Sequence, residues 1–472
     1  MNRRLRSYAL VLVTVGVAAL GSACGGAKKQ ANVATPPPAG QQAPYGQGPQ
    51  VQQPAYPQQA PPPPSGAAAP GKLEMNGSAQ SAYQKGIAAY AAGDLAGAKS
   101  ALQQAVSSDP KAYQARYSLG VVLERMGDAS ALTEYRQATT IKPDYEPAIL
   151  ANALLIANKG SIGEAETYLN GKMGQLPNSA GVTAALAEIK SMQRDTASAQ
   201  RLAQEALKKN SDYRPAMVTI ARDHYRNRRL DLALYALQAI LDGFGTDNPP
   251  RDKDNPDAHF LRGLILKEEG RRAAAINEFK LAATLRPDLV AARVELASYY
   301  LEAGNAVEAQ PLLEGALRYD ANNVIAHLNL GDCYRLASRI PEAKAQFDWV
   351  LAHDTSLAQV HYDLGLLYLF APTIPGMDAK RQTDEAIAEI NKYQQMRGKL
   401  AAGQSDDSEE LLNRAKQKQA DLQAQASEKA SPGAKGSGGA PAPASSAAKP
   451  AGGAPAPASS AAKPPAGKPG AK

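Results

Sequence analysis

Apolar residues recur at every third or fourth position through most of the chain between residues 79 and 400. This spacing places them along one face of an α-helix, whereas a β-strand would require apolar and polar residues to alternate. The segments are rich in alanine and leucine, and no alternating run of note interrupts them. The pattern therefore predicts an all-α fold built from short amphipathic helices.

The helical pattern also repeats along the chain. Residues 327–334 read H-x₂-L-G-x₂-Y, and residues 361–368 repeat the motif 34 positions later. Other units keep a small residue where Gly331 stands, a second small residue where Ala343 stands, and often a closing proline such as Pro287. This pattern resembles the tetratricopeptide repeat (TPR) signature. The resemblance implies about nine units of two antiparallel helices, stacked into a superhelical solenoid. Composition adds disordered N- and C-terminal segments on either side of it.

The amino terminus has the features of an export signal. Three arginines lie within the first six residues, and residues 8–20 then carry no charge, a stretch too short for a membrane span of about 20 residues. The following Leu20-Gly21-Ser22-Ala23-Cys24 resembles a lipobox. We expect residues 1–23 to be a lipoprotein signal peptide and Cys24 to carry the lipid. The alternative is an ordinary signal peptide cut after Ala23, which leaves a free thiol.

Composition divides the rest of the chain into four segments. Residues 24–78 are rich in proline and glutamine and bury too little apolar surface to offset the entropy of ordering, so we expect a disordered tether. Residues 79–400 hold the repeats, and residues 401–429 contain a polar capping helix. Residues 430–472 form an alanine-, proline- and lysine-rich low-complexity tail. This tail is either a solubilising arm or a basic arm that contacts anionic peptidoglycan or lipopolysaccharide.

The net charge of +7 does not indicate a nucleic-acid partner. The first 23 residues contribute three arginines and the last 43 contribute five lysines, and neither segment has an acidic residue. The part between them is therefore almost neutral, and it shows no basic helix face of the kind that nucleic acid requires.

The repeats leave no room for a catalytic domain, and the chain has no nucleotide-binding glycine loop, GxSxG, HExxH or CxxC motif. His259, His327 and His361 occupy the same position in different units. Stacked helices lie about 8–10 Å apart, so these side chains would not share one metal ion. We expect no enzyme activity, metal, cofactor or small-molecule substrate, and we interpret Cys333 as a buried packing residue.

In TPR proteins the first helix of each unit lines an inner groove that binds a protein segment. Repeat phase assigns eleven apolar or tyrosine side chains to that groove: Tyr83, Ile87, Tyr90, Tyr117, Val121, Phe260, Leu264, Ile325, Leu328, Tyr362 and Leu366. Leu328 and Asp332 stand where chaperone-binding TPR domains carry a lysine and an asparagine, so that partner class does not fit. The alternative for about half of these side chains is packing within the solenoid.

Two insertions depart from the repeat. Residues 241–255 lengthen the turn between the fifth and sixth units, and residues 370–383 separate the helices of the ninth. Their proline and glycine residues predict loops. We expect the second insertion to expose Phe370, Ile374 and Met377, either as part of a binding surface or as a neutral length variant.

The layout of lipobox, tether, repeats and late insertion resembles the TPR lipoproteins of the myxobacterial adventurous gliding motility machinery (GltE/AglT type). The resemblance implies a non-enzymatic scaffold in a trans-envelope complex with other envelope proteins. Gly25 after Cys24 favours the outer membrane, with the protein lipid-anchored and facing the periplasm. Two alternatives stay open: a pilotin-like assembly factor for a type IV pilus secretin, and a docking regulator of peptidoglycan synthesis.

Overall fold

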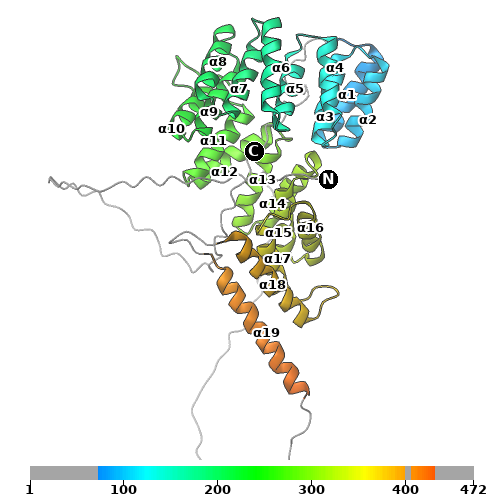
Figure 1. The fold of residues 1–472 in the computed structure, drawn as a ribbon, viewed down its shortest axis with the longest axis vertical. Helices are drawn as coiled ribbons and strands as arrows, with labels where there is room; N and C mark the ends of the chain where they lie inside the picture. Colours follow the sequence, from blue (N-terminus) through cyan, green and yellow to red (C-terminus); the bar gives the residue numbers. More distant parts are fainter. Residues whose placement is uncertain (1–72, 399–405, 431–472) are drawn as a thin grey trace, which may run out of the picture. The chain divides into compact units, whose positions relative to one another are not determined.

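The computed structural model describes residues 73–398 and 406–430, which fold into helices joined by turns, with no strand among them (Figure 1). Cys24, the signal peptide, the tether up to residue 72 and the tail from residue 431 lie outside these described residues. The all-α prediction is confirmed. None of the described helices is both long and apolar enough to cross a bilayer.

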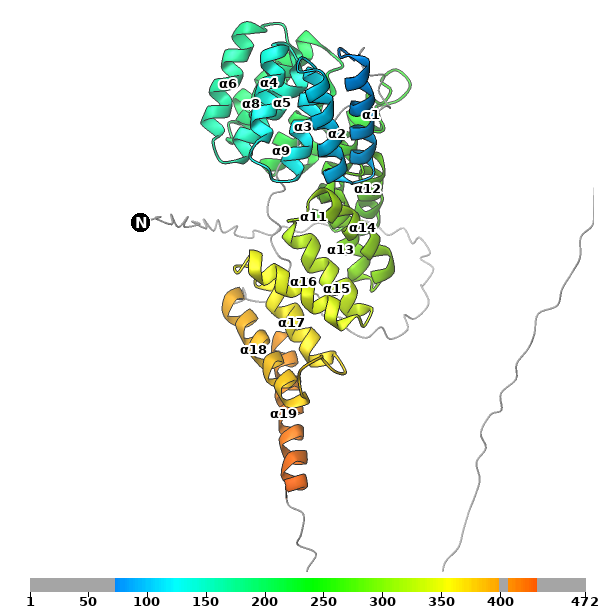
Figure 2. The same ribbon diagram turned by 90° about the vertical axis from the view of Figure 1, so that its right-hand side faces the viewer.

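Nine helix pairs follow one another within the described residues, and each helix contacts the next along the chain (Figure 2). The first helices of the pairs are α1 (Gly77–Ala91), α3 (Tyr113–Arg125), α5 (Glu146–Asn158), α7 (Ala180–Met192), α9 (Arg214–Arg226), α11 (Pro256–Glu268), α13 (Val290–Glu302), α15 (Val324–Leu336) and α17 (Gln359–Phe370). The second helices are α2 (Leu95–Ser108), α4 (Ala131–Ile141), α6 (Ile162–Gln175), α8 (Thr196–Lys209), α10 (Leu230–Leu241), α12 (Arg272–Leu285), α14 (Ala306–Tyr319), α16 (Ile340–His353) and α18 (Ala379–Arg397). A last helix, α19 (Ser408–Ala430), packs on α18 and also contacts α17.

Within a pair, a small residue of the first helix meets a large residue of the second. A Cβ atom added at Gly263 would lie 2.6 Å from the ring of Phe279, and one added at Gly120 would lie 2.6 Å from the ring of Tyr135. Both distances are shorter than real Cβ contacts. Phe279 and Tyr135 are fully buried. The glycines of the repeat are therefore needed for close helix approach.

A left-handed residue ends the first helix of most pairs. Glycine takes this conformation at five of the equivalent positions, including Gly93 at φ 78° and Gly270 at φ 71°. Arg194, Arg228 and Ser338 take it in three other pairs, with φ values of 65°, 61° and 57°. A side chain in this region costs about 1–2 kcal/mol. The turn geometry is thus imposed by packing of the repeat even where the sequence does not favour it.

The second insertion differs from the expectation. The loop covers only residues 371–378, because Asp378 caps α18 by accepting a hydrogen bond from the backbone N–H of Arg381 at 2.7 Å. Phe370 is 53% exposed, as expected, but Ile374 is only 3% exposed and Met377 is half-buried. The prediction that Ile374 would be exposed is wrong, because the loop folds back and places Ile374 in the apolar core.

Candidate functional site

The eleven side chains assigned to the inner groove all lie on first helices of pairs, namely α1, α3, α11, α15 and α17. Six of them are buried against the rest of the chain: Tyr83, Tyr90, Tyr117, Val121, Leu328 and Tyr362. The other five are half-buried: Ile87, Phe260, Leu264, Ile325 and Leu366. More than half of the eleven side chains therefore pack within the solenoid.

Tyrosines form a packed cluster in the first two pairs. Tyr117 is 1% exposed, and its ring centroid lies 5.6 Å from that of Tyr145 and 5.9 Å from that of Tyr135. Tyr135 donates a hydrogen bond to Glu124 at 2.6 Å. Burial raises the pKa of Tyr117 well above its ordinary value. Tyr117 is therefore a core residue, and its removal would affect folding before it affected a partner.

Charged groups occupy the equivalent face of α7 and α9. The carboxylate of the buried Glu188 accepts from Arg226 at 2.6 Å, Arg222 at 3.0 Å and the hydroxyl of Thr219 at 3.0 Å. Burial opposes ionisation of Glu188, but the two guanidinium groups outweigh it and lower its pKa. Apolar residues alone, when taken at the groove positions, do not reveal this network. The signal was available, since Glu188 and Arg222 stand at the repeat position of Val121 and Leu264.

The polar section continues along the next pairs. Lys267 of α11 contacts Glu295 of α13 at 2.7 Å, and Tyr225 of α9 donates to Glu268 of α11 at 2.8 Å. Polar contacts therefore join neighbouring units in the middle of the stack. In α15, near the C-terminal end, Asp332 stands at the repeat position of Val121 and forms an ion pair with Arg335 at 2.8 Å.

The histidines of the repeat act in packing and in hydrogen bonds within the chain. The Nδ1 atom of His259 lies 2.7 Å from Glu278, and its Nε2 atom lies 2.9 Å from the carbonyl oxygen of Lys253. His327 and His353 stack on the two sides of Trp349, with centroid distances of 3.6 Å and 3.7 Å. No group of three metal-ligating side chains occurs among the described residues.

The thiol of Cys333 is enclosed within the solenoid. Cys333 lies on α15 and is 1% exposed. Burial raises the pKa of its thiol to about 12. Such a thiol is protonated at neutral pH and is a poor nucleophile, which agrees with its interpretation as a packing residue.

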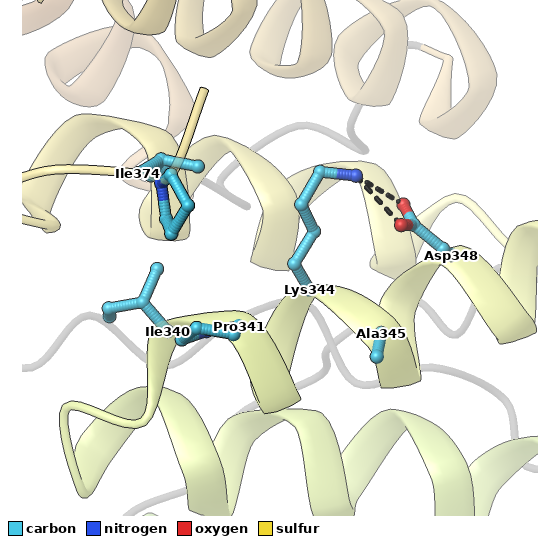
Figure 3. A pocket seen from close by; sticks show the side chains of 7 residues that line it. Ile340, Pro341, Lys344, Ala345, Asp348 and Ile374 are labelled. Atoms are coloured by element: carbon cyan, nitrogen blue, oxygen red, sulfur yellow. Dashed lines mark hydrogen bonds and ion pairs between the residues drawn. The ribbon is translucent and has the colours of Figure 1, made fainter. Parts of the chain in front are cut away.

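A small open cavity of about 230 Å³ lies between α16 and the loop before α18 (Figure 3). On its rim, Lys344 donates to both carboxylate oxygens of Asp348, at 2.8 Å and 2.7 Å. Its lining residues are Ile340, Pro341, Lys344, Ala345, Asp348, Ile374 and Pro375. The cavity is apolar apart from this ion pair, and it holds no arrangement suited to catalysis.

The last two units leave apolar surface open at the ends of their first helices. Leu336 and Phe370 end α15 and α17 as exposed apolar residues, and Ile325 and Leu366 are half-buried on the same helices. We call these four residues the C-terminal face. The guanidinium of Arg414 on α19 lies 5.8 Å from the ring centroid of Phe370. The C-terminal face therefore offers apolar surface beside a cationic group.

Family models for tetratricopeptide repeats match residues 83–146 and 218–289, and a second such model matches residues 300–364. A curated relative, DnaJ homolog subfamily C member 3 of Bos taurus, is 25% identical over 232 residues. That match covers 49% of this chain and 41% of the relative, so this chain spans less than half the length of the curated protein it matches.

Two solved structures that are similar to this chain have TM-scores below 0.5. Yeast Tom70 gives a TM-score of 0.44 at 15% identity, over 62% of this chain and 64% of that one. The Pseudomonas aeruginosa protein pilF gives 0.30 at 19% identity, over 47% of this chain and 97% of that one. These values say nothing about a partner. The repeat motif, the nine helix pairs and the matched family models agree, and the described part of the chain is a tetratricopeptide-repeat solenoid.

Proposed function

We propose that this chain is a lipid-anchored scaffold of the bacterial outer membrane that binds other envelope proteins as part of a trans-envelope gliding motility complex. The observation that carries the proposal is a repeat solenoid whose C-terminal face stays partly open, with Leu336 and Phe370 exposed and Ile325 and Leu366 half-buried. TPR solenoids are protein-interaction scaffolds. Exposed aromatic and aliphatic groups beside a cation suit a protein segment better than a small polar ligand.

The anchor and the tether supply the position of this scaffold. An acylated Cys24 would hold the chain in the membrane, because each buried CH₂ of an acyl chain contributes about 0.8 kcal/mol. The proline-rich tether of about 50 residues would reach about 150 Å if fully extended, at about 3 Å per residue. The solenoid would therefore meet partners well inside the periplasm while the lipid stays in the outer membrane.

Deletion of the gene tests the cellular role. Loss of single-cell gliding with intact pili and normal wall synthesis is the expected result. Intact gliding would overturn the motility role, and loss of pilus assembly or altered wall synthesis would identify one of the two alternatives. A Cys24→Ala chain should fold with unchanged helicity but leave the membrane fraction, and membrane retention of this variant would contradict lipid anchoring.

Binding through the C-terminal face has a separate test. Leu366→Ser with Phe370→Ser should reduce in-cell crosslinking to envelope partners at least tenfold. The matched control is Val307→Ser, because Val307 on α14 is 82% exposed but lies outside this face. Equal crosslinking by the two variants would rule out the C-terminal face as the binding surface.

A further inference from the structure

The first two repeat units contact a distant part of the chain. The carboxylate of Asp288, in the turn before α13, accepts a hydrogen bond from the hydroxyl of Tyr90 at 2.8 Å and one from the guanidinium of Arg125 at 2.8 Å. Arg125 also donates to the Tyr90 hydroxyl at 3.3 Å. Asp288 is separated from Tyr90 by 198 positions in sequence, so this contact does not arise from the stacking of neighbouring units.

A second contact lies beside the first. The hydroxyl of Tyr319, at the end of α14, donates to the carbonyl oxygen of Ala91 at 3.0 Å. The rings of Tyr319 and Tyr90 meet edge to face with centroids 5.7 Å apart. We call these five residues, Tyr90, Ala91, Arg125, Asp288 and Tyr319, the clasp.

The clasp closes a circuit of helices. Each helix from α1 to α14 contacts the next, and the clasp joins α1 and α3 back to the turn before α13 and the end of α14. The apolar core reflects this closure. One cluster includes residues of the first two units, such as Leu102, together with Val294 and Leu313 of the seventh. Separate clusters serve the units between them.

The charges of the clasp are almost fully enclosed. The side chains of Arg125 and Asp288 are each 6% exposed. Burial opposes the charge of Arg125, but Tyr90 and Asp288 outweigh it and raise the pKa of the guanidinium above its ordinary value. A buried ion pair adds little net stability, because desolvation offsets its attraction, whereas one buried charge without its partner is strongly unfavourable. The contact between the first two units and the seventh therefore depends on a carboxylate at the position of Asp288.

We propose that Tyr90 and Arg125 form a carboxylate-binding site on the inner face of the first two units, which the chain keeps shut with its own Asp288. An acidic side chain of a protein partner takes the place of Asp288 and opens the circuit. Asp288 is followed by the buried Leu289, so the partner segment carries an acidic residue next to an aliphatic one. This inference rests on the proposed role in protein binding. Its tests use the purified chain and a peptide, so they can fail independently of the envelope role.

Opening is measured by energy transfer between dyes on cysteines at Lys85 of α1 and Glu308 of α14, both exposed, in the full chain with Cys24→Ser and Cys333→Ala. Asp288→Asn should lower the transfer efficiency, because it removes the carboxylate that holds Arg125. The control is Asp257→Asn, which removes a carboxylate from the nearby Arg286–Asp257 pair at 2.8 Å without touching the clasp. Unchanged transfer in Asp288→Asn, with helicity intact, would overturn the proposal.

Binding is measured with a labelled peptide that has the sequence of residues 284–292, TLRPDLVAA, as the probe. It should bind the Asp288→Asn chain at least tenfold more tightly than the unaltered chain. A peptide with asparagine in place of its aspartate should lose that binding. Equal binding of the two peptides, or binding of neither, would overturn the carboxylate site.

A disulfide provides the closed reference. A Cβ atom at Gly93 would lie 3.1 Å from the Cβ atom of Arg318, so Gly93→Cys with Arg318→Cys should crosslink the shut circuit under oxidation. In the Asp288→Asn background, the oxidised chain should show high energy transfer and no peptide binding, and reduction should lower the transfer and restore peptide binding. Peptide binding by the oxidised chain would show that the site lies elsewhere and would contradict the proposal.

Discussion

The two ends of the solenoid differ in how much apolar surface their first helices leave open. In the closed circuit of α1 to α14, the inner positions of the first units hold Tyr83, Tyr90 and Tyr117, all of them buried. At the other end, α15 and α17 leave Leu336 and Phe370 exposed. The equivalents of Tyr117 at that end, Leu328 and Tyr362, are buried as well, so the open surface comes from the last residues of α15 and α17. A scaffold can bury one part of its inner face and keep another open.

The largest expected difference between the two regions concerns stability. Tyr117→Ala should lower the free energy of unfolding by about 4 kcal/mol, because it empties a fully packed aromatic site. Phe370→Ala should lower it by less than about 1 kcal/mol, because that ring is mostly in solvent. Urea denaturation followed by circular dichroism measures both. Similar losses for the two variants would contradict the contrast between a buried and an exposed inner face.

The charged middle of the circuit should respond to acid. Because the pKa of Glu188 is lowered in the folded chain, its contribution is fully present above the unfolded pKa of about 4.3 and is lost as the pH falls through the folded value. Glu188→Gln should cost about 3 kcal/mol at pH 7, since it leaves two partly buried arginines without their carboxylate.

The pH dependence of this variant gives the check. Denaturation at pH 7 and at pH 3 should show a smaller difference for Glu188→Gln than for the unaltered chain. An exposed pair supplies the control, because Glu164 and Arg136 are both more than half exposed, and Glu164→Gln should change neither curve. An unchanged acid response of Glu188→Gln would show that this carboxylate does not govern acid stability.

Adding a methyl group at the glycine of a unit should cost the same stability in the closed circuit as in the C-terminal units. Gly263→Ala and Gly331→Ala should each lower the free energy of unfolding by about 2 kcal/mol, because the new methyl group meets the ring of Phe279 or Phe347. The same denaturation measurement applies. A much smaller cost at Gly331 would indicate that the C-terminal units are packed more loosely, and would extend the contrast from the inner face to the core.

The smallest expected effect is an increase in stability. Arg228→Gly in the circuit and Ser338→Gly near the C-terminal end should each stabilise the chain by about 0.5 kcal/mol, because glycine adopts a positive φ without strain but loses more entropy on folding. Thermal denaturation would show a small rise in Tm for both. A loss of stability at either site would mean that the side chain makes contacts worth more than the backbone strain.

Most of the fold was predictable because each unit repeats the same local packing. The glycine and aromatic positions, such as Gly263 and Phe279, recur with a 34-residue period. This period predicts which residues contact each other within a unit and between neighbouring units. The clasp was not predictable in this way. Whether Asp288 reaches Arg125 depends on the small rotation between each unit and the next, summed over many units. The repeat pattern in the sequence does not determine these rotations. Ile374 was misplaced for a related reason, since loop length alone does not show that the loop folds back.

The candidate site was predictable only in outline. Repeat phase placed Tyr83 and Tyr117 on the correct helices, yet it gave no measure of how much surface they retain. Glu188 and Arg222 were not predicted because only apolar residues were selected. Both stand at a repeat position that is apolar in other units, and they form an ion pair in which Glu188 is buried. Charge at a repeat position that is otherwise apolar is a usable signal, because a buried carboxylate requires a cation from a neighbouring unit.

The stacked indole of Trp349 makes one unit of the solenoid optically distinct. It is the sole tryptophan of the chain, and it lies between the imidazole rings of His327 and His353. Its emission therefore reports the eighth unit alone, whereas far-ultraviolet dichroism averages over every helix. In a stack held by nearest-neighbour interfaces, the two signals need not change at the same denaturant concentration. Their separation would reveal whether the solenoid unfolds as one cooperative body or begins to fray at its C-terminal end.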